Sequence, residues 1–306
     1  MTFARVAIVG LGLLGGSIGL AIAENLPDTS TTGFDSDPDV RRRAAERGLV
    51  GTVCETMAEA VADADLVILC VPVGAMGGAA QAIGGHLKPG ALVSDTGSSK
   101  GSVQTALAEA LPGQPVIPAH PVAGTERSGP EAGFASLFHN RWCILTPPAD
   151  ADPALVEALG EFWRALGATV DVMDAAHHDL VLAITSHLPH LIAYTIVGTA
   201  SDLEQVTRSE VIKYSAGGFR DFTRIAASDP TMWRDVFLAN REAVLEMLQR
   251  FSEDLTALQR AIRWGDGEKL YDLFARTRAI RRSIIEQGQD VDEPDFGRED
   301  HGSFSD

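Results

Sequence analysis

The glycine-rich run GLGLLG at residues 10–15 constrains the fold of this chain more than any other feature. It follows a short β-branched run at 5–10 (RVAIVG) and opens a stretch of helical character at 13–25 (LLGGSIGLAIAEN). A strand, a G-x-G-x-x-G turn and a helix in this order form the phosphate-binding start of a dinucleotide-binding unit. A glycine-rich turn without a ligand is the alternative, but it would not require this placement between a strand and a helix.

Each position of the motif has a physical role in this interpretation. Gly10 permits a tight turn, Gly12 lets the backbone approach a pyrophosphate, and Gly15 lets the helix and the strand pack closely. Leu14 lies with them at the start of the helix, where backbone N–H groups and the positive end of the helix dipole attract phosphate.

Asp35 favours NAD over NADP as the cofactor. It ends a predicted strand at 32–35, about 20 residues beyond the motif, where an acid binds the adenosine ribose 2′-hydroxyl and repels a 2′-phosphate. Three arginines follow closely and would soften this preference, although a solvated helix face is their more usual role: Arg41, Arg42 and Arg43.

Further apolar runs are typical of strands buried in a parallel sheet, and they lie at 65–72, 91–98, 115–124 and 141–147. Their alternation with helical stretches predicts an α/β domain at residues 1–172, with a Rossmann-type, doubly wound, mostly parallel sheet. Val71 and Pro72 end one of these strands near the place where a nicotinamide would lie; a simple strand exit is the alternative.

The pattern changes after TVDVM at 169–173, beyond which no convincing strand follows. Helical periodicity at 176–200, 228–265 and 267–285 predicts an all-α C-terminal domain at 173–286. The acidic, polar and aperiodic stretch at 287–306 is expected to be a disordered tail.

Composition excludes several classes of partner. A formal net charge of −17 repels nucleic acid and anionic membranes, and an anionic substrate would need specific arginines to bind. The three cysteines have no metal-ligand or disulfide spacing, which favours a reducing cytoplasm. The apolar run at 6–23 contains five glycines and lacks a cleavage pattern, so we do not expect a signal peptide or membrane helix. The histidines have no nearby acids at ligand spacing, so no metal site is predicted.

Four polar clusters carry candidate chemistry. DTGSSK (95–100) and HPVAGTERSG (120–129) each follow a predicted strand, and the carboxyl ends of strands line the ligand crevice of an open α/β sheet. TSHLPH (185–190) lies inside a predicted helix and places two histidines on one face. GGFRDFTRIAASDPTMW (217–233) joins two predicted helices.

Together these segments resemble the prephenate dehydrogenases, including the arogenate and dual-specificity cyclohexadienyl enzymes. The resemblance covers residues 5 to about 286, because the glycine motif and the four clusters occur in the family's order and approximate spacing. It implies a Rossmann domain and a helical dimerisation domain with the active site between them. Such enzymes convert prephenate to 4-hydroxyphenylpyruvate, or arogenate to tyrosine, with NAD(P) and loss of CO2.

The resemblance also implies roles for individual residues. His120 is the base, and a neutral imidazole with a pKa near working pH suits removal of a hydroxyl proton as hydride leaves. Ser98 binds the substrate hydroxyl and aligns His120, with capping of the following helix as a second role. Arg224 holds the ring carboxylate, since a guanidinium offers a bidentate grip. An ion pair with Asp221 is the alternative for Arg224.

Other positions have a structural alternative beside the role that the resemblance implies. His190 resembles a substrate-contacting position, Arg220 lies near the substrate side chain or on the surface, and Trp233 walls the pocket or packs between helices. His187 contacts the substrate or is a core histidine. Glu126 couples the active-site geometry to pH or stabilises its loop, and Lys100 has a structural or a cofactor role. His177 and His178 are expected to face solvent.

Two alternatives compete with this function. A 3-hydroxyacid-type dehydrogenase would use a lysine base, for which Lys213 is the candidate, although that family's surrounding motif is missing. A non-catalytic NAD-binding sensor would keep the glycine motif and Asp35 without needing His120, Ser98 and Arg224. The sequence leaves open prephenate against arogenate, feedback inhibition by tyrosine, and the strictness of the preference for NAD.

Overall fold

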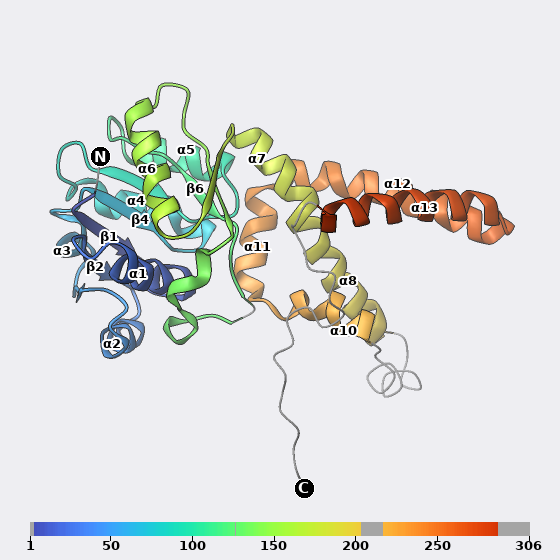
Figure 1. Cartoon of the computed structure of the whole chain (residues 1–306), viewed down its shortest axis with the longest axis horizontal. Helices are drawn as coiled ribbons and strands as arrows, with labels where there is room; N and C mark the ends of the chain where they lie inside the picture. The colour runs from blue at the N-terminus through green and yellow to red at the C-terminus, as the bar shows by residue number, and fades with distance from the viewer. Residues whose placement is uncertain (1–2, 126, 203–216, 287–306) are drawn as a thin grey trace, which may run out of the picture. The chain divides into compact units, whose positions relative to one another are not determined.

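A computed structural model describes residues 3–125, 127–202 and 217–286 of the chain (Figure 1). Glu126, Lys213 and the acidic stretch at 287–306 lie outside these ranges. The chain forms two compact units, one up to Met247 and one from Leu248 onward. All candidate site residues that the structure describes belong to the first unit.

The first unit is built on a five-stranded parallel sheet in the order β3-β2-β1-β4-β5. The strands are β1 (Arg5–Val9), β2 (Ser30–Phe34), β3 (Thr52–Val53), β4 (Leu66–Leu69) and β5 (Leu92–Asp95). The expected doubly wound, mostly parallel sheet is therefore confirmed.

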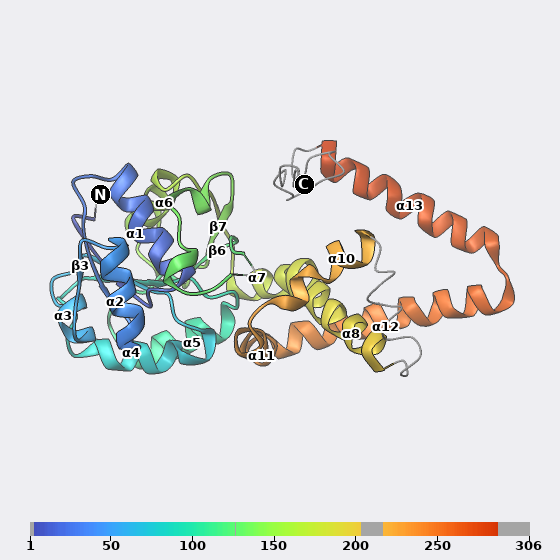
Figure 2. The ribbon, with the colours of Figure 1, turned by 90° about the horizontal axis from the view of Figure 1, so that it is seen from below.

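Alternate residues of the central strand enter two separate cores. Val6 and Ile8 pack on the side of α1 (Leu13–Asn25) and α6 (Pro153–Ala165). Ala7 and Val9 pack on the side of α3 (Met57–Val61), α4 (Met76–Gly84) and α5 (Gly101–Ala110) (Figure 2). Because both faces of the sheet are covered, its strands read as continuous apolar runs. Helix α2 (Pro38–Arg47) ends at Gly48, whose φ of 62° is the left-handed conformation that glycine adopts readily.

The expected strand at 115–124 is divided between two sheets. Residues 115–117 hydrogen-bond to Val93 of β5, and the chain then enters a second sheet, in which β6 (Ala119–Pro121) pairs antiparallel with β7 (Trp142–Leu145). β8 (Thr169–Val172) pairs parallel with β7. Pro118 and Pro121 have no N–H to donate, which limits how far either ladder can continue. His120 lies in the short strand between these two prolines.

The helical part of the first unit differs from the expected long helices. The stretch expected as one helix at 176–200 consists of α7 (Ala175–Leu182), a π-helical turn (Ala183–His187) and α8 (Leu188–Asp202). Pro189 cannot donate to the preceding turn, and a π-helical turn accommodates the lost bond. The stretch expected as a linker between helices contains α10 (Gly217–Thr223) and a 3-10 turn (Arg224–Ala227).

The helix expected at 228–265 is interrupted at Asn240, which separates α11 (Pro230–Ala239) from α12 (Arg241–Trp264). The side chain of Asn240 donates 2.8 Å to the Asp179 carbonyl and lies 3.1 Å from His187 Nδ1. These tertiary hydrogen bonds hold the residue at the junction in a non-helical conformation, so they explain why helical periodicity alone missed the break.

The second unit contains the rest of α12 and the helix α13 (Gly267–Glu286). A turn at Gly265, with φ of 69°, ends α12 before α13 begins. Large apolar side chains of this unit are exposed to solvent: Leu255, Ile262, Trp264, Tyr271, Phe274 and Ile280. Exposed apolar surface of this kind is typical of protein–protein or membrane interaction sites.

Among the described residues, one helical stretch, Ala175–Asp202, is long and apolar enough by composition to cross a membrane, with a mean hydropathy of 1.6. A core helix of a soluble protein meets the same criterion. Here the stretch carries buried polar residues, His178, Asp179 and His187, which bond to the rest of the first unit.

Candidate active site

His120 lies buried on β6 and contacts the first turns of α7. Its Nδ1 is 2.8 Å from His178 Nε2, and His178 Nδ1 is 2.9 Å from Asp179 Oδ1. The prediction that His178 faces solvent is therefore wrong, since its side chain is fully buried. His177, its neighbour in sequence, is exposed as predicted.

Asp179 joins α7 to the start of α5. Its carboxylate accepts hydrogen bonds from the backbone N–H groups of Lys100 at 2.7 Å and Gly101 at 2.9 Å. Burial opposes the charge of Asp179, but the hydrogen bonds from His178 and from these N–H groups hold the pKa of the carboxyl below its ordinary value. Asp179 is therefore a carboxylate placed at the positive end of a helix.

The structure also excludes the second role considered for Ser98, which was capping of the following helix. Helix α5 has Lys100 at its N-cap without a side-chain cap of its own, so the alternative in which Ser98 caps this helix is wrong. Ser98 lies half-buried in the loop between β5 and α5, and no hydrogen bond joins it to His120 within the described residues.

Lys100 connects β5 to β6 immediately before His120. Its buried Nζ donates to Asp95 Oδ2 and, at 2.7 Å, to the Ala119 carbonyl. Burial lowers the pKa of Lys100, while the adjacent Asp95 carboxylate opposes that effect. These contacts give Lys100 a structural role in the site.

Burial sets the protonation state of the histidines. It lowers the pKa of His120 well below 6.5, and the neighbouring His178, Lys100 and His187 lower it further. Burial likewise lowers the pKa of His178, and it lowers the pKa of His187 to about 4. The expectation of a base with a pKa near working pH is therefore corrected to a lower value, and His120 is neutral at neutral pH.

A second group of side chains lies between α8 and α11. His190 stacks on the buried Trp233, with ring centroids 3.6 Å apart and an interplanar angle of 24°. His190 Nδ1 donates to the Ser186 carbonyl at 2.9 Å. Burial lowers the pKa of His190, and the nearby charge of Arg224 adds to that effect. The structure therefore brings His190, Trp233 and Arg224 together, whereas Arg220 is exposed on α10.

Three residues of the hydrogen-bond network around His120 and His187 were not predicted from the sequence to belong to the site. They are Asp179, Asn240 and His178, which was expected to face solvent. Asp179 had a signal in the sequence, because an acid within an otherwise apolar helical stretch requires a buried partner. Asn240 had none, since its contacts come from α7 and the π-helical turn.

The glycine motif has the geometry that a dinucleotide site needs. Gly10 has φ of 97°, and a Cβ there would lie 2.4 Å from the Cys70 carbonyl oxygen. A Cβ on Gly15 would lie 1.9 Å from the Gly10 carbonyl oxygen, so close packing requires glycine. A Cβ on Gly12 would meet nothing within 4 Å, which leaves open space beside the N-terminus of α1. Leu14 is half-buried in the first turn of that helix.

Asp35 and the strand exit after β4 flank this motif. Asp35 Oδ2 accepts from the Leu11 N–H at 2.9 Å, so the carboxylate lies against the glycine loop. Val71 is half-buried, with its Cγ1 3.3 Å from the position of a Cβ on Gly10. Pro72 is exposed and begins a 3-10 turn, Val73–Ala75.

The three arginines after Asp35 are paired with carboxylates. Arg41 binds Glu55 at 3.2 Å, while Arg42 binds Asp39 and Glu46, and Arg43 binds Asp39 and Glu131. Because these charges are compensated, they offer little attraction to a 2′-phosphate, which supports the preference for NAD.

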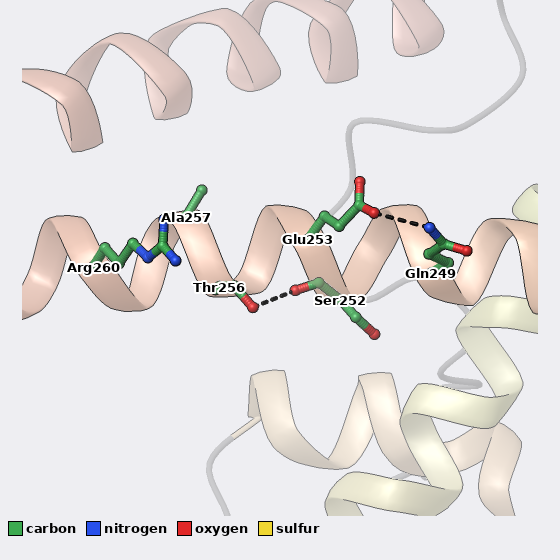
Figure 3. Close-up of a pocket in the computed structure, with 6 residues that line it drawn as sticks. All are labelled: Gln249, Ser252, Glu253, Thr256, Ala257 and Arg260. Atoms are coloured by element: carbon green, nitrogen blue, oxygen red, sulfur yellow. Dashed lines mark hydrogen bonds between the residues drawn. The ribbon is translucent and has the colours of Figure 1, made fainter.

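A separate hollow of about 400 Å³ lies along α12 (Figure 3). Its lining residues are Gln249, Ser252, Glu253, Thr256, Ala257 and Arg260, and none of them is a candidate site residue. No group of three or more potential metal ligands occurs among the described residues.

Two family models match consecutive parts of the chain. A model of the prephenate dehydrogenase nucleotide-binding domain matches residues 18–172, and a model of the prephenate dehydrogenase dimerization domain matches residues 174–276. A cyclohexadienyl dehydrogenase of Zymomonas mobilis is 43% identical over 282 residues, which cover 92% of this chain and 96% of the relative.

Solved structures agree with the sequence matches. The prephenate dehydrogenase of A. aeolicus, in complex with hydroxyphenyl propionate and NAD+, has a TM-score of 0.87 and 32% identity, covering 93% of this chain and 99% of its own. An arogenate dehydrogenase of Synechocystis has a TM-score of 0.78 and 25% identity, covering 92% and 99%.

Two glycine substitutions are expected to affect different properties, one the stability of the fold and the other the binding of NAD. Gly15→Ala forces a Cβ onto a backbone oxygen, so the free energy of unfolding should fall by about 1–3 kcal/mol, as for other overpacked sites. Gly12→Ala meets no protein atom and should cost less than about 1 kcal/mol. It should nevertheless raise the KM for NAD, because the new methyl group occupies the space beside the helix N-terminus.

Thermal unfolding and the KM for NAD measure the two effects separately. Equal destabilisation by both substitutions would contradict the assigned geometry. An unchanged KM for NAD in Gly12→Ala would show that the cofactor does not approach this residue.

Proposed function

This chain belongs to the prephenate dehydrogenase family, as its motifs predicted, and from that premise we propose that it catalyses the oxidative decarboxylation of prephenate, arogenate or both in tyrosine biosynthesis. It is an NAD-dependent oxidoreductase. The products are 4-hydroxyphenylpyruvate from prephenate and tyrosine from arogenate. The observation that carries the proposal is the buried, neutral His120 on β6, within a chain that matches both family domains.

The family match favours this function over the 3-hydroxyacid-type dehydrogenase and over the non-catalytic NAD-binding sensor. The candidate lysine base of the first alternative, Lys213, lies outside the described residues. A sensor would not need the buried histidine network that surrounds His120.

In the proposed reaction His120 accepts the proton of the ring hydroxyl. The O–H bond of the substrate breaks and an N–H bond forms on the imidazole, while the electron pair of the O–H bond forms the C=O bond. NAD, when bound, supplies the acceptor for the hydride that leaves the same carbon. The ring carboxylate then leaves as CO2, and the electron pair of the broken C–C bond completes the aromatic ring while the C=O π pair moves onto oxygen. That oxygen takes the proton back from His120 and becomes the phenol hydroxyl.

The other candidate residues orient the substrate. Ser98 hydrogen-bonds the substrate hydroxyl next to His120. Arg224 binds the ring carboxylate through paired charge-assisted hydrogen bonds, while His190 and Trp233 form a wall beside it. Arg220, exposed on α10, interacts with the carboxylate of the substrate side chain.

NAD is held by the residues around the glycine motif. The N–H groups at the start of α1, including those of Gly12, Leu14 and Gly15, would bind the pyrophosphate. Asp35 would bind the adenosine ribose, and Val71 and Pro72 would lie beside the nicotinamide. The open space at Gly12 and the compensated arginines support this arrangement.

The proposed assembly is a soluble, cytoplasmic homodimer. The dinucleotide-binding domain comprises residues 1–172, and the helical substrate and dimerisation domain comprises residues 173–286. The exposed apolar side chains of α12 and α13 support an interface with a second copy of the chain, since a solvated face of that kind is costly for a monomer.

The function is tested by following NADH absorbance with prephenate and with arogenate, each in the presence of NAD or NADP. We expect turnover with at least one substrate and a higher kcat/KM with NAD than with NADP. Absence of turnover with both substrates would contradict the proposed function, and an equal or better use of NADP would contradict the role of Asp35.

Substitution of the base and substitution of the carboxylate-binding residue should change different kinetic constants. His120→Asn keeps the size of the side chain but cannot accept the proton, so kcat should fall by about 100- to 10,000-fold while KM changes little. Arg224→Gln loses charge-assisted hydrogen bonds of about 1.5–3 kcal/mol, so KM should rise about 10- to 150-fold while kcat changes less.

The pH profile distinguishes these variants further. Only neutral His120 accepts a proton, so kcat/KM should fall as the pH drops through its pKa, which burial places below 6.5. This acid limb should persist in Arg224→Gln and vanish in His120→Asn. Wild-type turnover by His120→Asn, or an unchanged limb, would show that His120 is not the base.

The dimer is tested by sedimentation of the full chain at micromolar concentration. We expect twice the mass of the chain, and a shift toward the monomer when Phe274→Asp places a charge on the exposed face of α13. A fully active monomeric wild type would contradict the proposed assembly.

A further inference from the structure

A buried series of three side chains ends at Nδ1 of His120. His120 Nδ1 lies 2.8 Å from His178 Nε2, and His178 Nδ1 lies 2.9 Å from Asp179 Oδ1. Asp179 in turn accepts from the N–H groups of Lys100 and Gly101 at the start of α5. One end of the series is therefore fixed to backbone groups that can only donate.

The hydrogen positions in the series follow from this fixed end. The ionised carboxylate of Asp179 only accepts hydrogen bonds, so Nδ1 of His178 must carry the hydrogen that it donates. Burial keeps His178 neutral by lowering its pKa, so its Nε2 has a lone pair and accepts. His120 must then donate from Nδ1, and its Nε2 is left without a hydrogen.

We propose that His178 is a positioning residue for the reaction: held by Asp179, it fixes His120 in the tautomer whose Nε2 accepts the substrate proton. The inference rests on the proposed function, in which His120 is the base. Within the described residues Nε2 of His120 makes no hydrogen bond, which leaves it available to the substrate hydroxyl.

The same series stabilises the product of the proton transfer. When the substrate O–H bond breaks and an N–H bond forms at Nε2, His120 becomes an imidazolium whose Nδ1–H hydrogen-bonds more strongly to His178. The negative charge of Asp179 lies behind His178 and favours that positive charge. No proton needs to leave His120 until the phenol oxygen takes it back.

Removing the acceptor on His178 releases this constraint. The neutral His120 ring can then place its hydrogen on Nε2, where it blocks proton transfer, and the imidazolium loses its stabilising partner. The groups that face His120 are His178 on α7, Lys100 before α5 and His187 in the π-helical turn. Lys100 and His187 are unchanged in the variants below.

The experiment compares His178→Phe with His178→Gln, and uses His177→Phe as the matched control on an exposed neighbouring position. Phenylalanine keeps the bulk of the ring without an acceptor. Glutamine supplies an amide oxygen to accept from His120 and an N–H to donate to Asp179. Steady-state kinetics across pH and thermal unfolding are measured for each variant.

We expect kcat to fall about 10- to 100-fold in His178→Phe with little change in KM, less than the loss on removing the base itself. The acid limb of kcat/KM should move to lower pH, because the protonated base has lost its hydrogen-bond acceptor. His178→Gln should stay within about tenfold of the wild-type kcat, and His177→Phe should match the wild type.

Several outcomes would overturn the inference. Wild-type kcat in His178→Phe does so directly. Equal losses in the phenylalanine and glutamine variants do so because glutamine preserves both hydrogen bonds, and a lower kcat with an unmoved acid limb marks general damage to the structure. If His178→Phe does not fold, a kcat for His178→Gln more than 100-fold below the wild type overturns it, and one within tenfold supports it.

These failures are distinct from failure of the proposed function. If His120→Asn is inactive while His178→Phe behaves as the wild type, the base assignment stands and only the positioning role is lost. If His120→Asn is fully active, the base assignment fails and the positioning role fails with it. If the wild type turns over neither prephenate nor arogenate, the proposed function itself fails.

Discussion

The carboxylate of Asp179 is the contact on which the rest of the site depends. It binds two backbone N–H groups at the start of α5 and the ring of His178, while its own backbone carbonyl accepts from Asn240. Burying a carboxylate costs several kcal/mol. Hydrogen bonds to a charged group contribute about 1.5–3 kcal/mol each, so three of them are enough to offset that cost. One residue thus fixes α7 against the start of α5 through its side chain and against the junction of α11 and α12 through its backbone.

The sequence predicts those parts of the fold that depend on local pattern. Apolar runs such as 65–72 predict buried parallel strands because both faces of the sheet are covered. The glycine motif predicts the first strand, turn and helix because the requirement is steric: a Cβ on Gly15 would overlap a backbone oxygen. The transfer of the chain to a second sheet after residue 117 and the helix break at Asn240 depend on tertiary partners, which periodicity does not contain.

In the site, too, some features follow from local sequence and others depend on tertiary partners. The role of His120 is predicted by the resemblance of its motif to the family, whereas its place within β6 of a second sheet depends on tertiary pairing with β7. His177 and His178 are adjacent and alike in the sequence, yet one is exposed and the other is fully buried. Their difference follows from the rotation of α7 relative to β6, which Asp179 sets by binding α5. The signal in the sequence was Asp179, an acid in an apolar helical stretch. A buried acid needs a polar partner, and the adjacent His178 is a candidate for that partner.

Burial of the histidines also determines where the charge for substrate binding must come from. His120, His178, His187 and His190 all have lowered pKa values, so at neutral pH they contribute no positive charge. The positive charge of Lys100 is opposed by the carboxylate of Asp95 beside it. In the proposed reaction, attraction for the carboxylates of the substrate therefore falls on arginines such as Arg224, against the repulsion of a chain with a net charge of −17. The proposed mechanism thus separates two tasks that would conflict in one residue: a buried imidazole that is neutral accepts the proton, and a guanidinium binds the carboxylate.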